Sequence, residues 1–107
     1  MKRIASVIAV ASSDMETYER LHREVWPGVL ERLSLSNIRN YSIYRYGELL
    51  FSYMEYVGED YDADMALIAA DPVTQRWWEL TAPLQISLRE HESDPWWRTM
   101  LEVFHSE

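Results

Sequence analysis

The hydrophobic positions along the chain follow two different periods, which divide it into strand-like and helix-like segments. Residues 3–10 are rich in Ile, Val and Ala, a composition that favours a first strand. Over residues 15–33 the apolar and aromatic positions recur with helical spacing. Pro27 interrupts this stretch, because proline lacks a backbone donor and the residue before it avoids helical angles. We therefore expect a kink near Trp26, or a break after which Pro27 begins the next turn.

Two further strand-like segments predict an antiparallel hairpin. Residues 37–46 and 49–57 are rich in tyrosine, isoleucine and leucine, and Gly47-Glu48 between them is a short turn signal. The period of two places Tyr41 and Ile43 on one face of the sheet and the even-numbered residues around them on the other.

Helix start signals precede three segments. Ser13 or Asp14 is the expected cap of the first helix. A second helix is expected to begin at residues 58–60 and to run to about Ala70, with acidic residues where the helix dipole favours them. Asp71-Pro72 is a fresh cap followed by proline at the first helical position, and it predicts a short helix that carries Trp77-Trp78.

The C-terminal third completes a recognisable order of elements. Residues 84–94 are expected to form a loop, and residues 96–105 a last strand. The resulting order, β-α-β-β-α-(α)-β, matches the ferredoxin-like split βαβ arrangement, an α+β fold with an antiparallel sheet and helices on one face. The whole chain, residues 1–107, is expected to be one domain. Since one sheet face would be left uncovered, we predict a homodimer.

Charge and composition narrow the possible partners. Eighteen acidic residues against ten basic ones give a formal net charge of −8, whereas nucleic acid and anionic membranes attract basic surfaces. We therefore expect no nucleic acid and no membrane as partner, and a neutral small molecule as ligand. The chain has no cysteine, and its N-terminal apolar run is too short for a membrane span. Without a signal or a span, the cytoplasm is the expected location.

Tyr18, His22 and Trp26 recur every four residues, which places them on one face of the predicted helix. Leucines would be usual on a stripe that faces the core. An imidazole titrates near neutral pH, so between aromatic surfaces it suits proton transfer on a flat or ring-shaped polar ligand. The alternative is an aromatic-rich core helix with one hydrogen-bonded histidine, and spacing alone leaves both open.

Two tryptophan pairs add to the aromatic content, which is 13% of the chain. Adjacent helical residues diverge by about 100°, so one of Trp77 and Trp78 is expected to pack while the other meets a ligand. Indoles suit sugars, because the ring face packs on C–H groups and the N–H donates to a hydroxyl. The alternative places both in the core or in a subunit interface. For Trp96-Trp97 we favour packing or a subunit contact.

Other kinds of site have no signature in the chain. His91 and His105 stand alone, no histidines have metal-ligand spacing, and we expect no metal. Nucleophile motifs and glycine-rich phosphate loops are also missing. The residues by themselves thus indicate an acid/base histidine in an aromatic pocket that needs no cofactor.

The chain resembles the L-rhamnose mutarotase family over nearly its whole length, in motifs that occur in one order. These are Tyr18-x3-His22-x3-Trp26-Pro27, Asn40-Tyr41-Ser42-Ile43-Tyr44, Leu49-Leu50-Phe51, Asp71-Pro72-x-x-Gln75-Arg76-Trp77-Trp78 and Glu102-Val103-Phe104-His105. The resemblance implies a dimeric α+β barrel that interconverts the α and β anomers of L-rhamnose without a cofactor.

The resemblance also implies roles for single residues. His22 would be the acid/base residue, and Tyr18, Tyr41, Trp77 and Trp78 would hold the sugar. The sequence keeps all of these positions. It departs from the family in residues 84–94 and in Trp96-Trp97, which could alter the rim of the pocket.

Three alternatives remain at this point. Related enzymes are expected to act on L-fucose instead of L-rhamnose. Small dimeric α+β barrels also include haem-degrading and quinone-forming monooxygenases, in which His22 would be a haem ligand or a base. Finally, the chain could be a non-catalytic sugar-binding module, which would bind the sugar without speeding its anomer exchange.

Overall fold

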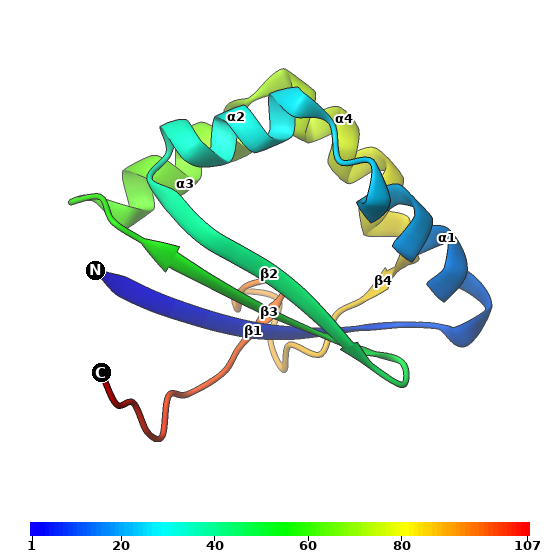
Figure 1. The fold of residues 1–107 in the computed structure, drawn as a ribbon. Coiled ribbons are helices and arrows are strands. Elements are labelled where there is room, and N and C mark those ends of the chain that lie inside the picture. The colour runs from blue at the N-terminus through cyan, green and yellow to red at the C-terminus, as the bar shows by residue number, and fades with distance from the viewer.

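A curved antiparallel sheet with helices on one of its faces makes up the protein, whose residues 1–107 are all described by a computed structural model (Figure 1). The strands are β1 (Lys2–Val10), β2 (Ile38–Tyr46), β3 (Leu49–Tyr56), β4 (Gln85–Ile86) and β5 (Arg98–Thr99). The helices are α1 (Ser12–Arg23), α2 (Pro27–Leu35), α3 (Tyr61–Ala70), α4 (Pro72–Thr81) and the 3-10 turn η1 (Ala82–Leu84). None of the helices combines the length and the apolarity needed to cross a bilayer.

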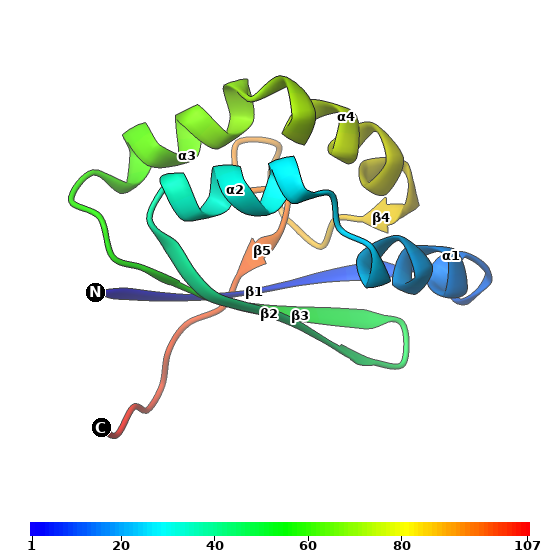
Figure 2. The ribbon, with the colours of Figure 1, turned by 45° about the horizontal axis from the view of Figure 1, so that its top comes forward.

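The sheet has β1 at its centre. Its order is β2-β3-β1-β4, and β5 also pairs with β1, on the same edge as β4. All pairs are antiparallel, and the β2–β3 hairpin turns at Gly47, whose φ of 61° favours glycine. The predicted hairpin and the α+β antiparallel fold class are therefore confirmed. Figure 2 shows the sheet curling beneath the helices as a half-barrel with one open face.

The helix-facing side of the sheet carries the core. Alternation along β1 points Ile8 and Val10 to this side, where they pack with residues of α1 and β3 in a cluster of Ile8, Val10, Met15, Tyr18 and Leu50. Ile43 of β2 packs against this cluster, as its predicted face requires. A bulge between Arg39 and Ser42, with Asn40 at a φ of 49°, sets the start of this alternation.

The long helical stretch is broken in two. Helix α1 ends at Arg23, and Pro27 begins α2, while Trp26 between them is extended with ψ 135°. The break is what the proline predicts, because the residue before proline avoids helical angles. The expected cap at Ser13 or Asp14 is wrong, since α1 begins one residue earlier and Asp14 already lies inside its first turn, donating its N–H to the carbonyl oxygen of Ala11 at 2.9 Å.

The caps of the later helices are side-chain carboxylates. Helix α3 begins at Tyr61 rather than at residues 58–60, because Asp60 is its cap and accepts from the N–H of Ala63 at 3.1 Å. Asp71 caps α4 as predicted, and its Oδ2 accepts from the N–H of Thr74 at 2.9 Å and from the Thr74 hydroxyl at 2.8 Å.

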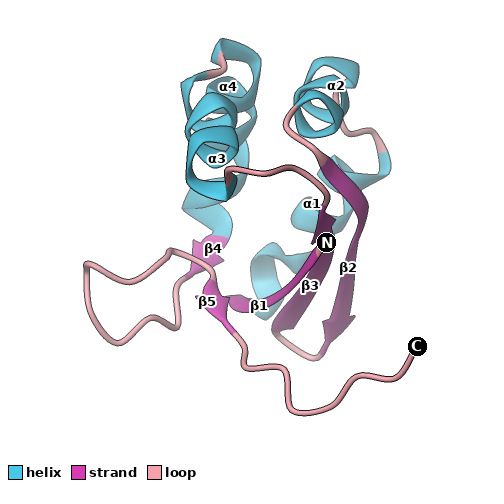
Figure 3. Cartoon of the chain, turned by 90° about the vertical axis from the view of Figure 1, so that its left-hand side faces the viewer, coloured by secondary structure: helices cyan, strands magenta, loops and turns pink.

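The C-terminal segment differs most from expectation. Residues 84–94, expected to be loop, contain β4, and the predicted last strand over residues 96–105 shrinks to β5. After β5 the N–H of Met100 makes the last backbone hydrogen bond to β1, at the carbonyl of Ala5. The remaining tail, residues 101–107, leaves on the side of the sheet away from the helices (Figure 3), where no strand is present to pair with it. Its apolar residues predicted a strand, but a strand also needs a partner.

Candidate functional site

Tyr18 and His22 form a stacked pair on α1. They are one helical turn apart, and their ring centroids lie 4.5 Å from each other at an interplanar angle of 18°. Nδ1 of His22 lies 3.0 Å from the carbonyl oxygen of Tyr18. A carbonyl only accepts hydrogen bonds, so Nδ1 must carry the proton in this bond. In the neutral ring, Nε2 then keeps a free lone pair that can accept a proton.

The surroundings of His22 favour this neutral form. The side chain is half-buried, and burial lowers the pKa of His22 below its ordinary value of 6.5, while the bond to the Tyr18 carbonyl opposes the shift in part. At neutral pH the imidazole is therefore uncharged, and its Nε2 is available as a base.

Trp77 contacts both His22 and Trp26, the residue at the break between α1 and α2. It is buried on α4, and its indole meets the ring of His22 edge-on at 5.3 Å and the ring of Trp26 edge-on at 5.4 Å. The regular helical ladder of the sequence thus ends after His22, since Trp26 lies beyond the last turn of α1. Trp77 nevertheless gathers both residues into one aromatic cluster, in which Trp26 packs behind Trp77.

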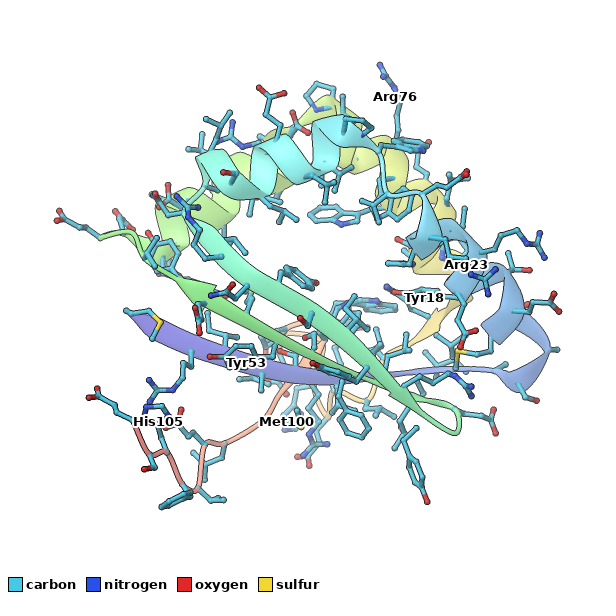
Figure 4. All side chains as sticks on the ribbon, in the orientation of Figure 1. Tyr18, Arg23, Tyr53, Arg76, Met100 and His105 are labelled. Atoms are coloured by element: carbon cyan, nitrogen blue, oxygen red, sulfur yellow. The ribbon has the colours of Figure 1, made fainter.

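The hydroxyl of Tyr18 is held by Gln85, which no sequence motif singles out, and Gln85 is held in turn by Trp96, for which packing or a subunit contact is expected from the sequence. Nε2 of Gln85 donates to it at 3.0 Å, and Nε1 of Trp96 donates to Oε1 of Gln85 at 2.8 Å. Tyr18 is buried between α1 and the sheet (Figure 4), and burial raises the pKa of its hydroxyl, with the bond from Gln85 opposing the shift. The sequence predicts a loop at Gln85, because a strand of two residues such as β4 leaves no periodic signal.

Tyr41 projects from β2 to the same side of the sheet. The residue is 41% exposed, and its hydroxyl end is the part that burial affects. This burial, with smaller contributions from Tyr18 and Tyr61, raises the pKa of Tyr41 to about 12. Tyr41 is thus a neutral hydrogen-bonding group on the concave face.

Trp78 lies outside the aromatic cluster of Tyr18, His22, Trp77 and Trp26. It is 43% exposed and lines a shallow groove beside α4 together with Trp96, Gln75, Glu79, Ala82 and Pro83. Trp97 packs against the core cluster around Tyr18, as expected for packing. His91 and His105 are exposed and lie apart from the cluster, and Figure 4 shows His105 on the tail beyond the sheet.

Comparison with known proteins identifies the family. The family model for L-rhamnose mutarotase matches residues 3–106. The chain belongs to the L-rhamnose mutarotase family. A member from Bacillus subtilis is 37% identical over 86 residues, covering 78% of this chain and 80% of the relative. One from Opitutus terrae is 34% identical and covers 98% of both chains. The resemblance noted in the sequence motifs is thereby confirmed.

Solved structures show the same fold at lower identity. An L-rhamnose mutarotase from Formosa agariphila superposes with a TM-score of 0.78 at 20% identity, over the full length of both chains. Tetracenomycin F2 cyclase from Streptomyces glaucescens, a polyketide cyclase, reaches 0.71 at 17% identity, over 100% of this chain and 97% of the other. Membership of the L-rhamnose mutarotase family therefore rests on sequence, and the structural likeness establishes the α+β fold.

Proposed function

We propose that the chain is an L-rhamnose mutarotase, an isomerase that interconverts the α and β anomers by opening and reclosing the pyranose ring. The observation that carries this proposal is the Tyr18–His22 pair. One nitrogen of the imidazole is tied to a backbone carbonyl, the other is free to take a proton, and a tyrosine hydroxyl lies in the same cluster.

The proposed mechanism needs two proton transfers in each direction. Nε2 of His22 removes the proton of the anomeric hydroxyl, the bond from C1 to the ring oxygen breaks, and the ring oxygen receives a proton from a tyrosine or from water. Rotation about the C1–C2 bond presents the other face of the aldehyde. The same transfers in reverse then close the ring, so that protons and electrons balance without any co-reactant.

The remaining aromatic residues are proposed to hold the sugar. Trp77 meets the ring of His22 in a T-shaped contact, and Tyr41 offers a neutral hydroxyl on the same side of the sheet. Both would orient the sugar ring against the base and limit access of water. Contact of Trp78 with the sugar stays a prediction, because Trp78 faces the groove beside α4.

We also propose that the protein works as a homodimer, closing a dimeric α+β barrel. The face of the sheet away from the helices carries apolar residues, and the tail that lies on this side exposes others. A second copy would cover both.

Saturation-transfer NMR on equilibrated L-rhamnose, L-fucose and D-glucose tests the enzymatic proposal. We expect the wild-type protein to speed exchange between the anomers of L-rhamnose, His22→Ala to abolish this effect, and His91→Ala to leave it unchanged. His91 is a matched control because it is an exposed loop histidine. Faster exchange of L-fucose alone would change the substrate, and no enhancement for any sugar would refute the mutarotase proposal. Full activity in His22→Ala would remove His22 from the catalytic role.

A further inference from the structure

We infer that Gln85 and Trp96 are positioning residues, which fix the direction of the hydrogen bond at Tyr18 so that its hydroxyl proton is offered to the bound sugar. The inference rests on the proposed function, since it concerns the same site. It assigns a role to two residues in the part of the chain where the sequence departs from the family.

The direction of the hydrogen bond between Gln85 and Tyr18 follows from which groups can donate and which can accept. An indole N–H only donates, so the group of Gln85 that meets Trp96 Nε1 at 2.8 Å must be the amide oxygen. This fixes the flip of the Gln85 amide and turns its NH2 group to the oxygen of Tyr18, 3.0 Å away. An amide NH2 group only donates as well. The oxygen of Tyr18 is therefore the acceptor in this contact.

Because Tyr18 accepts the bond from Gln85, the single proton of its hydroxyl is left for another acceptor. With Gln85 occupying one acceptor site on the oxygen, the proton must point elsewhere, and the bond from Gln85 is the one hydrogen bond that this hydroxyl makes within the chain. The Tyr18 ring stacks on His22, so an oxygen atom of a sugar placed against His22 is the natural acceptor. Tyr18 would then donate while His22 accepts.

Trp96 itself is held in place on two sides. Its carbonyl accepts from the hydroxyl of Ser87 at 2.6 Å, and the guanidinium of Arg89 lies 5.1 Å from its ring centroid. Gln85 is fixed by its strand, which sets it opposite Val10 of β1. The segment after α4 thus supplies an ordered relay from Trp96 through Gln85 to Tyr18.

Gln85→Glu separates this role from simple packing. Glutamate has nearly the same shape and still accepts from Trp96, but its carboxylate also accepts from Tyr18 and turns the hydroxyl proton away from the sugar. We expect anomer exchange to fall by about tenfold or more. Trp96→Phe keeps an aromatic ring at this position but frees the amide of Gln85 to flip. We expect a smaller loss of anomer exchange in this variant. Glu31→Gln, which exchanges the same two side-chain groups at an exposed position of α2 outside the relay, is the control and should keep full exchange.

Two further measurements make the result decisive. In a Tyr18→Phe background, Gln85→Glu should cause no additional loss, because no hydroxyl proton remains to be redirected. The pKa of Tyr18, followed by NMR of its labelled Cζ carbon, should rise in Gln85→Glu, since a donor is replaced by an anionic acceptor. This titration needs no substrate, so it separates failure of the inference from failure of the mutarotase proposal. An unchanged Tyr18 titration, wild-type exchange in Gln85→Glu, or an equal loss in both backgrounds would overturn the inference.

Discussion

The stacked residues Tyr18 and His22 have pKa values that move apart. Burial lowers the pKa of His22 and raises that of Tyr18, so both side chains are neutral at pH 7. A neutral imidazole with a free Nε2 is ready to accept a proton, and a neutral phenol is ready to give one. Environments that separate two pKa values in this way are typical of sites where one group acts as base and the other as acid. The same burial thus prepares both halves of the proposed transfer.

The lowered pKa of His22 predicts how activity depends on pH. Its Nε2 is free to act as a base only while the ring is neutral, so protein-enhanced exchange should fall as pH is lowered from 8, and it should reach half of its plateau only at a pH below 6.5. The measurement is saturation-transfer NMR across this range, with the uncatalysed exchange subtracted. Half-loss of the enhancement at or above pH 6.5 would contradict the role assigned to His22.

The lowered pKa of His22 also predicts how the free energy of unfolding changes with pH. Because the folded state binds the His22 proton less readily than the unfolded state, lowering the pH below 6.5 should reduce the free energy of unfolding. Urea unfolding of His22→Gln should lack this part of the pH dependence, and His91→Ala should keep it.

At the scale of elements, helix α4 holds Trp77 against His22 of α1. Its start is set by Asp71, and the pKa of Asp71 is lowered by the bonds from the N–H and the hydroxyl of Thr74. Thr74 is buried, so its N–H has no solvent to replace the lost partner. The cap therefore stabilises the helix and, through it, the contact between Trp77 and His22.

Asp71→Ala should lower the free energy of unfolding by about 1–2 kcal/mol, as expected for a lost side-chain cap. Asp62→Ala is the control, because Asp62 lies in the first turn of α3 without being its cap. Urea unfolding followed by tryptophan fluorescence measures both. Because the folded-state pKa of Asp71 is lowered, its contribution is present above its ordinary pKa and is lost as pH falls through the lowered one. Equal stabilities of the two variants would contradict this role of the cap.

Local signals predicted the elements that depend on local chemistry. Pro27 fixed the helix break, Asp71-Pro72 fixed the start of α4, and alternation placed Tyr41 and Ile43 on the concave face. Contacts between distant segments had no such signal. Nothing in the sequence indicated that Trp77 would meet Trp26, or that Gln85 would reach Tyr18 across 67 positions of the chain.

The tail shows why the last strand was mispredicted. Its composition is that of a strand, but pairing depends on what lies beside it, and β1 offers partners only to Arg98, Thr99 and the N–H of Met100. The sequence therefore described a segment suited to pairing, while one copy of the chain supplies no partner for most of it.

At the scale of the whole molecule, the half-barrel leaves one face of its sheet without a cover. In the tail on this side, Leu101, Val103 and Phe104 are 87%, 90% and 82% exposed. A salt bridge of 2.9 Å between Arg3 and Glu102 ties the tail to β1. Contiguous exposed apolar surface of this kind marks an interaction site. A second copy of the chain would bury the sheet face and the tail together.

This proposal predicts the mass of the protein in solution. Light scattering after size exclusion should give twice 12.7 kDa for the wild type. Val103→Asp should shift the equilibrium to the monomer without changing monomer stability, because Val103 touches little of its own chain. Leu35→Asp is the matched control, since Leu35 is equally apolar and 62% exposed but ends α2 in the helical layer. If Val103→Asp keeps the wild-type mass, the tail lies outside the interface; if the wild type itself runs at 12.7 kDa, the homodimer is wrong.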